Sequence, residues 1–113
     1  MAYIGQSPGT KALTASDIAD DLITSAKLNY AETTLTDGAT VSWDASTADV
    51  AKVTLGGNRT LAAPTNGTTG QFISLLIIQD GTGSRTLTWN AVFEFASDTA
   101  PTLTTTANLG DVF

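Results

Sequence analysis

The feature that most constrains the fold is a short apolar run from Phe72 to Ile78, which has turn-forming residues on both sides. Gly70 precedes the run, and Asp80-Gly81-Thr82-Gly83 follows it. The run is short, rich in branched side chains and fenced by glycines, so it predicts a β-strand rather than a helix. Because nearly every residue in it is apolar, we expect both faces of this strand to be buried.

Further short strands are predicted on both sides of this run. Residues 50–55 and 85–90 alternate between apolar and polar side chains, residues 31–44 are typical of a hairpin with Asp37-Gly38 at its tip, and Gly56-Gly57-Asn58 predicts another turn. Seven or eight such strands indicate an all-β domain over residues 31–113, with a β-sandwich or jelly-roll-like fold. The largest side chains expected in its core are Trp43, Phe72, Trp89 and Phe93.

The composition narrows the possible partners. Five basic residues stand against eleven acidic ones, and no run of Lys or Arg could follow a phosphate backbone, so we expect no nucleic-acid partner. Cysteine and histidine are absent, which excludes disulfides and thiolate or imidazole metal sites. The first thirty residues do not resemble a secretory signal, and no apolar run could span a bilayer. We therefore expect no membrane insertion.

Catalytic chemistry finds little support in the sequence. Without histidine or cysteine, acid–base work would depend on Glu32 and Glu94, the only two glutamates, and Glu94 is expected on the solvent face of a strand. We predict that the chain is not an enzyme and has no catalytic site, cofactor or bound metal. A calcium site at Asp80, or in the loop from Asp44 to Asp49, stays open as an alternative, although turn chemistry accounts for these carboxylates first.

Two segments precede the predicted β-domain. Residues 1–13 contain Tyr3 and Ile4 ahead of a turn at Ser7-Pro8-Gly9, and they are either a disordered terminus or a peptide that becomes ordered against a partner. Residues 14–30 carry a narrow apolar stripe that is too short for a stable isolated helix. This neck is either a helical or irregular connector or an oligomerisation segment. Its apolar residues include Ile18, Leu22, Ile23 and Leu28.

Three strings in fixed order resemble a β-domain of tailed-bacteriophage virion proteins, namely tail fibres and related surface appendages. They are Thr-Leu-Gly-Gly-Asn-Arg-Thr-Leu at 54–61, Gln-Asp-Gly-Thr-Gly-Ser-Arg-Thr-Leu-Thr-Trp at 79–89 and Ala-Pro-Thr-Leu-Thr at 100–104. The resemblance covers about residues 36–113. Residues 18–28 are similar to the linkers of trimeric phage fibres, and residues 1–5 are similar to the start of fibre anchors that dock onto a virion.

The resemblance implies a virion structural protein that is assembled in the host cytoplasm and forms the N-terminal, virion-attaching part of a homotrimeric tail fibre or similar appendage. Tyr3, Ile4 and Pro8 would then dock onto a tail adaptor, hub or capsid protein. Similar proteins continue with another aromatic-rich strand beyond the position of Phe113, so we expect a β-domain that is incomplete at its C-terminus. Any contact with a host surface glycan would lie in that missing part. The neck residues expected around the threefold axis are Ile18, Leu22, Ile23 and Leu28.

Two other functions remain open from the sequence. A capsid head fibre or decoration protein would differ from a tail fibre in its position on the particle, which the sequence does not determine. A carbohydrate-binding module would need exposed aromatic platforms. Trp43 and Trp89 are in phase with Val41 and Leu87, so we expect them in the core instead.

Overall fold

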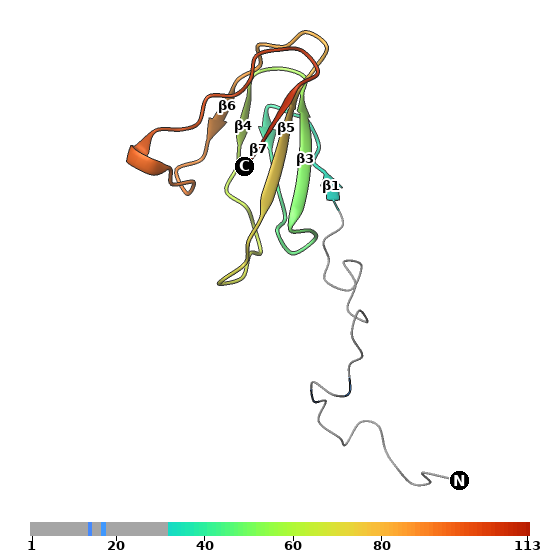
Figure 1. The fold of residues 1–113 in the computed structure, drawn as a ribbon, viewed down its shortest axis with the longest axis vertical. Helices are drawn as coiled ribbons and strands as arrows, with labels where there is room; N and C mark the ends of the chain where they lie inside the picture. Colours follow the sequence, from blue (N-terminus) through green and yellow to red (C-terminus); the bar gives the residue numbers. More distant parts are fainter. Residues whose placement is uncertain (1–13, 15–16, 18–31) are drawn as a thin grey trace, which may run out of the picture.

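The computed structural model describes Thr14, Asp17 and residues 32–113, and these residues form an all-β domain (Figure 1). The predicted all-β class is thereby confirmed. The described part of the chain contains seven strands and one short 3-10 turn, η4. In chain order they are β1 (Glu32–Thr34), β2 (Thr40–Val41), β3 (Val50–Leu55), β4 (Arg59–Leu61), β5 (Ser74–Gln79), β6 (Leu87–Trp89), η4 (Ala96–Asp98) and β7 (Gly110–Val112).

The strands form two facing sheets that are built mainly from parallel pairs. One sheet has the order β1-β3-β5-β7 and the other has the order β2-β4-β6. Every pair is parallel except β5–β7, which is antiparallel. The chain therefore winds as a coil of three turns: β1 and β2 form the first turn, β3 and β4 the second, and β5 and β6 the third. Stacked turns of this kind each bury their apolar face against their neighbours.

The coil corrects our expectation of antiparallel hairpins. Asp37-Gly38 and the turn at residues 56–58 do not join hydrogen-bonded partners; each lies at a corner where the chain passes from one sheet to the other. Parallel neighbours need a long connection between them, and here the strand in the opposite sheet supplies it. The alternation of side chains in residues 50–55 correctly predicts the buried face of β3, but it does not identify the pairing partner.

The core lies between the two sheets and consists of aligned rows of inward side chains. The registers place Ala51 beside Leu75 and Val53 beside Ile77 in one sheet, and all four side chains are buried. The facing sheet contributes a row made of Val41, Leu61 and Trp89. Leu35, Trp43 and Leu55 complete the buried cluster, with Leu35 placed directly after β1. The in-register parallel pairing therefore stacks the inward side chains of successive turns on one another.

Two predictions about the apolar run are wrong. Strand β5 is not buried on both faces: Leu75 and Ile77 are buried, whereas Leu76 and Ile78 on the outer face are only half-buried. Phe72 is not a core residue, because 91% of its surface is exposed. It lies in the loop before β5 rather than in the strand, so the strand's alternation does not govern where its side chain points.

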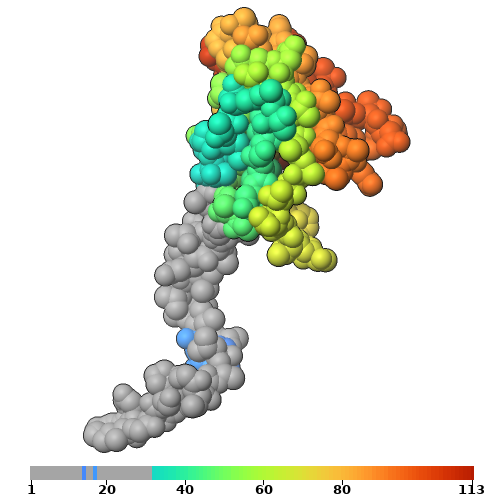
Figure 2. Space-filling view, turned by 180° about the vertical axis from the view of Figure 1, so that it is seen from behind, coloured from blue at the N-terminus to red at the C-terminus, as the bar shows by residue number. Residues whose placement is uncertain are grey.

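The segment between β6 and β7, residues 90–109, leaves the coil before it returns, and we call it the arm. Part of the arm projects from the body on the same side as the loop before β5 (Figure 1), and the view from behind shows both projections again (Figure 2). Residues 93–95 alternate between apolar and polar side chains in the sequence, but they form no strand. After the arm the chain returns to the coil as β7, which pairs antiparallel with β5.

Candidate functional site

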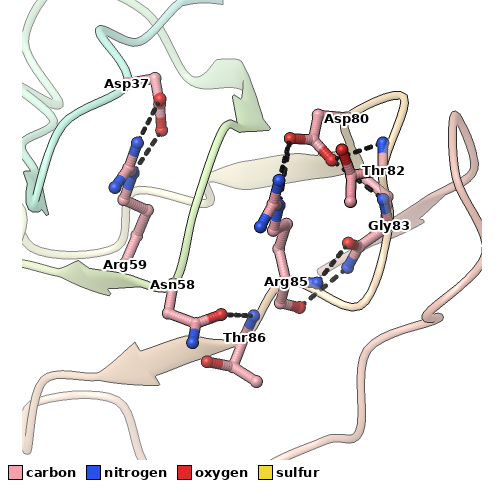
Figure 3. Close-up of polar contacts among 9 residues, drawn as sticks. Asp37, Asn58, Arg59, Asp80, Thr82, Gly83, Arg85 and Thr86 are labelled. Carbon is pink, nitrogen blue, oxygen red and sulfur yellow. Dashed lines mark hydrogen bonds and ion pairs between the residues drawn. The ribbon is translucent and has the colours of Figure 1, made fainter.

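The corners between the two sheets stack on one edge of the coil and are joined by side chains (Figure 3). Arg59 in the second turn donates two hydrogen bonds to the carboxylate of Asp37 in the first turn, from Nε to Oδ1 and from Nη2 to Oδ2, both 2.7 Å long. Thr86 in the third turn donates its backbone N–H to Oδ1 of Asn58 at 3.1 Å. The Arg59 guanidinium lowers the pKa of Asp37 below its ordinary value. These contacts tie each turn to the next and fix the register of the coil.

The third corner is closed by Asp80. Its Oδ1 accepts the backbone N–H groups of Thr82 and Gly83 at 3.0 and 2.9 Å, while Arg85 donates Nη2–H to its Oδ2 at 2.8 Å. The hydrogen bond from Arg85, helped by the two backbone donors, lowers the pKa of Asp80 to about 2. A carboxylate with this many donors already serves as the centre of its own turn. Turn chemistry therefore accounts for Asp80.

The loop from Asp44 to Asp49 shows the same behaviour. Asp44 accepts from the backbone N–H and the hydroxyl of Ser46, and Asp49 accepts from the side chain of Gln71 at 2.6 Å. Among the residues that the structure describes, no group of acidic side chains is arranged to hold a metal ion. Both carboxylates are used to shape and anchor the loop.

Gln79 holds the C-terminal segment against the third turn, and the sequence analysis did not single it out. Its side chain is 1% exposed and lies between the sheets. Oε1 accepts the backbone N–H of Arg85 at 2.7 Å, and Nε2 donates to the carbonyls of Arg85 and Thr104 at 3.0 and 2.8 Å. A glutamine at an inward position of an otherwise apolar strand was the available signal, because buried amides are nearly always hydrogen-bonded.

An apolar hollow of about 260 Å³ lies on the edge of the coil opposite the corners. Trp89 is its centre and meets Phe93, Phe95 and Phe113 edge to face, with ring centroids 5.4, 5.1 and 5.2 Å apart. We call this site the aromatic hollow. The residues that line it are Trp43, Ile73, Leu75, Trp89, Phe93, Phe95 and Phe113.

The aromatic hollow exists because the third turn of the coil does not close as the first two do. In the first turn, the loop after Trp43 folds back at once, and the indole N–H of Trp43 donates to the carbonyl of Ala48 at 3.2 Å. In the second, Gln71 ties the return loop to the carbonyl of Ala45 at 2.7 Å. After Trp89 the chain instead departs as the arm (Figure 1). Among the residues that the structure describes, no returning loop fills the hollow beside the rings.

The arrangement suits apolar contact better than catalysis. Of the two glutamates, Glu32 forms an ion pair with Lys52 at 2.6 Å, while Glu94 is exposed on the arm. Trp43 is 2% exposed, which confirms it as a core residue rather than a stacking platform. Trp89 is half-buried in the wall of the hollow. The surface of the hollow is almost wholly apolar.

The residues that we predicted to act in anchoring and oligomerisation lie outside the described part of the chain. This applies to Tyr3, Ile4 and Pro8 of the anchor and to Ile18, Leu22, Ile23 and Leu28 of the neck. Their roles stay predictions. Within the described residues, no helix is long and apolar enough to cross a membrane.

Comparison with known proteins identifies the family. The model of the family described as "Putative phage tail fibre C-terminal domain" matches residues 34–111, which takes in all of the coil except the first residues of β1. Neither the curated proteins nor the solved structures gave a match. The family match agrees with the resemblance seen in the sequence, and it identifies the domain as a component of a virion. The chain belongs to this family of phage tail fibre domains.

Proposed function

We propose that the chain is a structural, non-enzymatic part of a homotrimeric phage tail fibre, with an N-terminal anchor, a neck and the β-coil as a rigid body. The observation that carries this proposal is the family match over residues 34–111. The coil supports it, because stacked parallel turns joined by corner contacts make a stiff element suited to load-bearing. The virion-attaching role falls to residues 1–13, and the trimeric contacts to the neck and to the outside of the coil.

The anchor is tested by deletion. Removing residues 1–11 should abolish incorporation into particles, measured by immunoblot of purified virions, while the melting curve of the β-domain stays unchanged. A matched control replaces only Thr10 and Lys11 by alanine, which leaves Tyr3, Ile4 and Pro8 in place. If the deletion variant is incorporated into particles as efficiently as the wild type, these residues do not act as an anchor. Single alanine variants at Tyr3 and Ile4 then show which side chain makes the contact.

The homotrimer is tested by the mass of the full chain in solution. Light scattering over about two decades of concentration should give three times the chain mass, and substitution of Ile18 and Leu22 by serine should lower it. Serine variants of Thr14 and Asp17, which carry no apolar side chain, serve as the control. A monomer at every concentration would refute the trimer.

The competing functions have distinct outcomes. A capsid head fibre or decoration protein would be found on the shell by immunogold labelling of whole particles, whereas a tail fibre is found at the tail. A carbohydrate-binding module would shift the emission of Trp89 when a glycan binds. The aromatic hollow offers almost no polar atoms, whereas recognition of a sugar needs hydrogen-bonding groups beside its aromatic platform. We therefore favour a protein contact at this site.

A further inference from the structure

One side chain of the described chain stands almost entirely in water although it is large and apolar. Phe72 is 91% exposed, in the loop before β5, which projects from the body (Figure 2). Its neighbour Ile73 points the other way and lines the aromatic hollow. No charged residue lies between Pro64 and Gln79. Aromatic side chains are enriched at protein–protein interfaces, and no charged neighbour in this loop would have to be desolvated when a partner covers the ring.

The backbone around Phe72 is also unpaired. Gln71 donates its N–H to Thr68 and Ser74 donates to Asp49, but no hydrogen bond reaches the backbone groups of Phe72 within the described residues. The loop can therefore offer both a ring and a peptide group to a partner. Substitution at Phe72 should leave the fold intact, because its side chain contributes almost no buried surface.

Strand β6 has the complementary property. It is the last strand of its sheet, and Arg59 donates its N–H to the carbonyl of Thr86 at 2.9 Å. In a parallel ladder the peptide groups of alternate residues face the same neighbour, so Thr88 also faces β4, while Leu87 and Trp89 face away from it. Within the described residues, no backbone hydrogen bond reaches the outward peptide groups of Leu87 and Trp89, and we call this the open edge; the returning arm lies beside it only at Leu87, where Pro101, Thr102 and Leu103 share a pocket with that residue. This edge carries no charged side chain to discourage pairing.

The open edge and the aromatic hollow meet at Trp89, which belongs to both. An extended segment can bind by adding a strand to an exposed sheet edge. The backbone groups of the edge then supply hydrogen bonds, and a pocket beside the edge takes one side chain of the segment. The hollow is almost wholly apolar, and its volume of about 260 Å³ leaves room for an aromatic ring. The occupant must therefore be an extended, uncharged segment with an exposed apolar ring.

We propose that the aromatic hollow beside β6 receives Phe72 from a second copy of this chain. The loop before β5 meets each requirement: it is uncharged, its backbone is free at Phe72, and its ring is exposed. The inference rests on the proposed self-association of the fibre and adds to it a contact in the β-domain, separate from the neck. Because the loop with Phe72 and the aromatic hollow are different surfaces, the contact gives a closed ring, an open filament or, if two copies exchange both contacts, a reciprocal pair.

The first test measures self-association of the full chain. Phe72→Ser should raise the dissociation constant on the order of 10- to 100-fold, since a phenylalanine side chain loses its burial. Val112→Ser is the matched control, because Val112 is 68% exposed but lies on the outer face of its sheet, opposite Leu76. Both variants should melt like the wild type when each is measured as a monomer. Light scattering across a dilution series gives the constants.

The second test uses the absence of natural cysteines. A mixture of Phe72→Cys and Phe95→Cys chains should form a disulfide-linked pair under mild oxidation, and neither variant should do so alone. Phe72→Cys mixed with Thr54→Cys is the control, because Thr54 is exposed on the outer face of β3. The linked product is read on a non-reducing gel.

The outcomes separate this inference from the proposed trimer. An oligomer of wild-type mass for Phe72→Ser, together with no cross-link between positions 72 and 95, would overturn the inference and leave the trimer standing. A weakened oligomer with the specific cross-link supports it, and its mass distinguishes a ring of three from a reciprocal pair. A wild-type chain that is monomeric throughout overturns both.

Discussion

Replacing Gln79 by leucine tests whether a buried amide holds the C-terminal segment onto the coil. The side chain is 1% exposed and makes three hydrogen bonds to backbone groups of Arg85 and Thr104. Leucine has a similar volume but leaves one N–H and two carbonyls without their partner. Each buried group left unpaired costs about 1–3 kcal/mol. Because Arg85 and Thr104, which carry these groups, are half-buried, we expect the free energy of unfolding to fall by about 3–5 kcal/mol.

Gln71→Leu is the matched control for this experiment. Gln71 also makes three hydrogen bonds, to Thr68, Ala45 and Asp49, but its side chain is half-exposed. Water can replace those partners, so we expect a loss of about 1 kcal/mol. The free energy of unfolding is measured by urea titration with tryptophan fluorescence at one fixed protein concentration. If Gln79→Leu loses no more stability than Gln71→Leu, burial of the amide is not what makes its bonds important.

Three further predictions use the same unfolding assay. Gly83→Ala should cost about 3 kcal/mol or more, whereas Gly70→Ala should cost about 1 kcal/mol; both have positive φ, but only at Gly83 would the new Cβ lie 2.5 Å from a backbone oxygen. Trp43→Ala should cost about 3–5 kcal/mol because the indole is fully enclosed, and a cost below about 2 kcal/mol would contradict that packing. Asp80 has its pKa lowered from 3.8 to about 2, so its contribution to stability is complete above about pH 4 and is lost as the pH falls through about 2. Asp80→Asn should therefore flatten this acid dependence, and an unchanged slope would contradict the assignment.

The sequence was informative about which side chains are buried and less so about which strands pair. Alternation in residues 50–55 correctly placed Ala51, Val53 and Leu55 in the core. The Asp37-Gly38 turn, however, suits a hairpin and a corner equally well, because both need a tight change of direction in a polar setting. The long-range partner decides between them. Here Arg59 supplies it for Asp37, and that pair is remote in the sequence.

The candidate site was harder to predict for a related reason. Trp89 and Phe93 were expected together in the core, and they do touch, but they form the wall of an open hollow rather than a closed interior. Openness depends on where the chain goes after β6, which is a property of the whole third turn. Phe72 was misplaced because it adjoins an apolar strand without belonging to it. Local patterns do not record the end of a strand to within one residue.

The unfinished third turn links the remaining observations. A coil of stacked turns ends in exposed strand edges unless its last repeat is covered. In one sheet β7 reverses direction and covers the edge of β5, but in the facing sheet no strand of the described residues pairs with the outer edge of β6. After β6 the chain continues as the arm instead of pairing with β6. The two phenylalanines of the arm, Phe93 and Phe95, line the hollow. The exposed edge and the hollow therefore have one cause, which is that the chain leaves the coil after β6. A segment from a second copy would pair with the edge and fill the hollow at the same time.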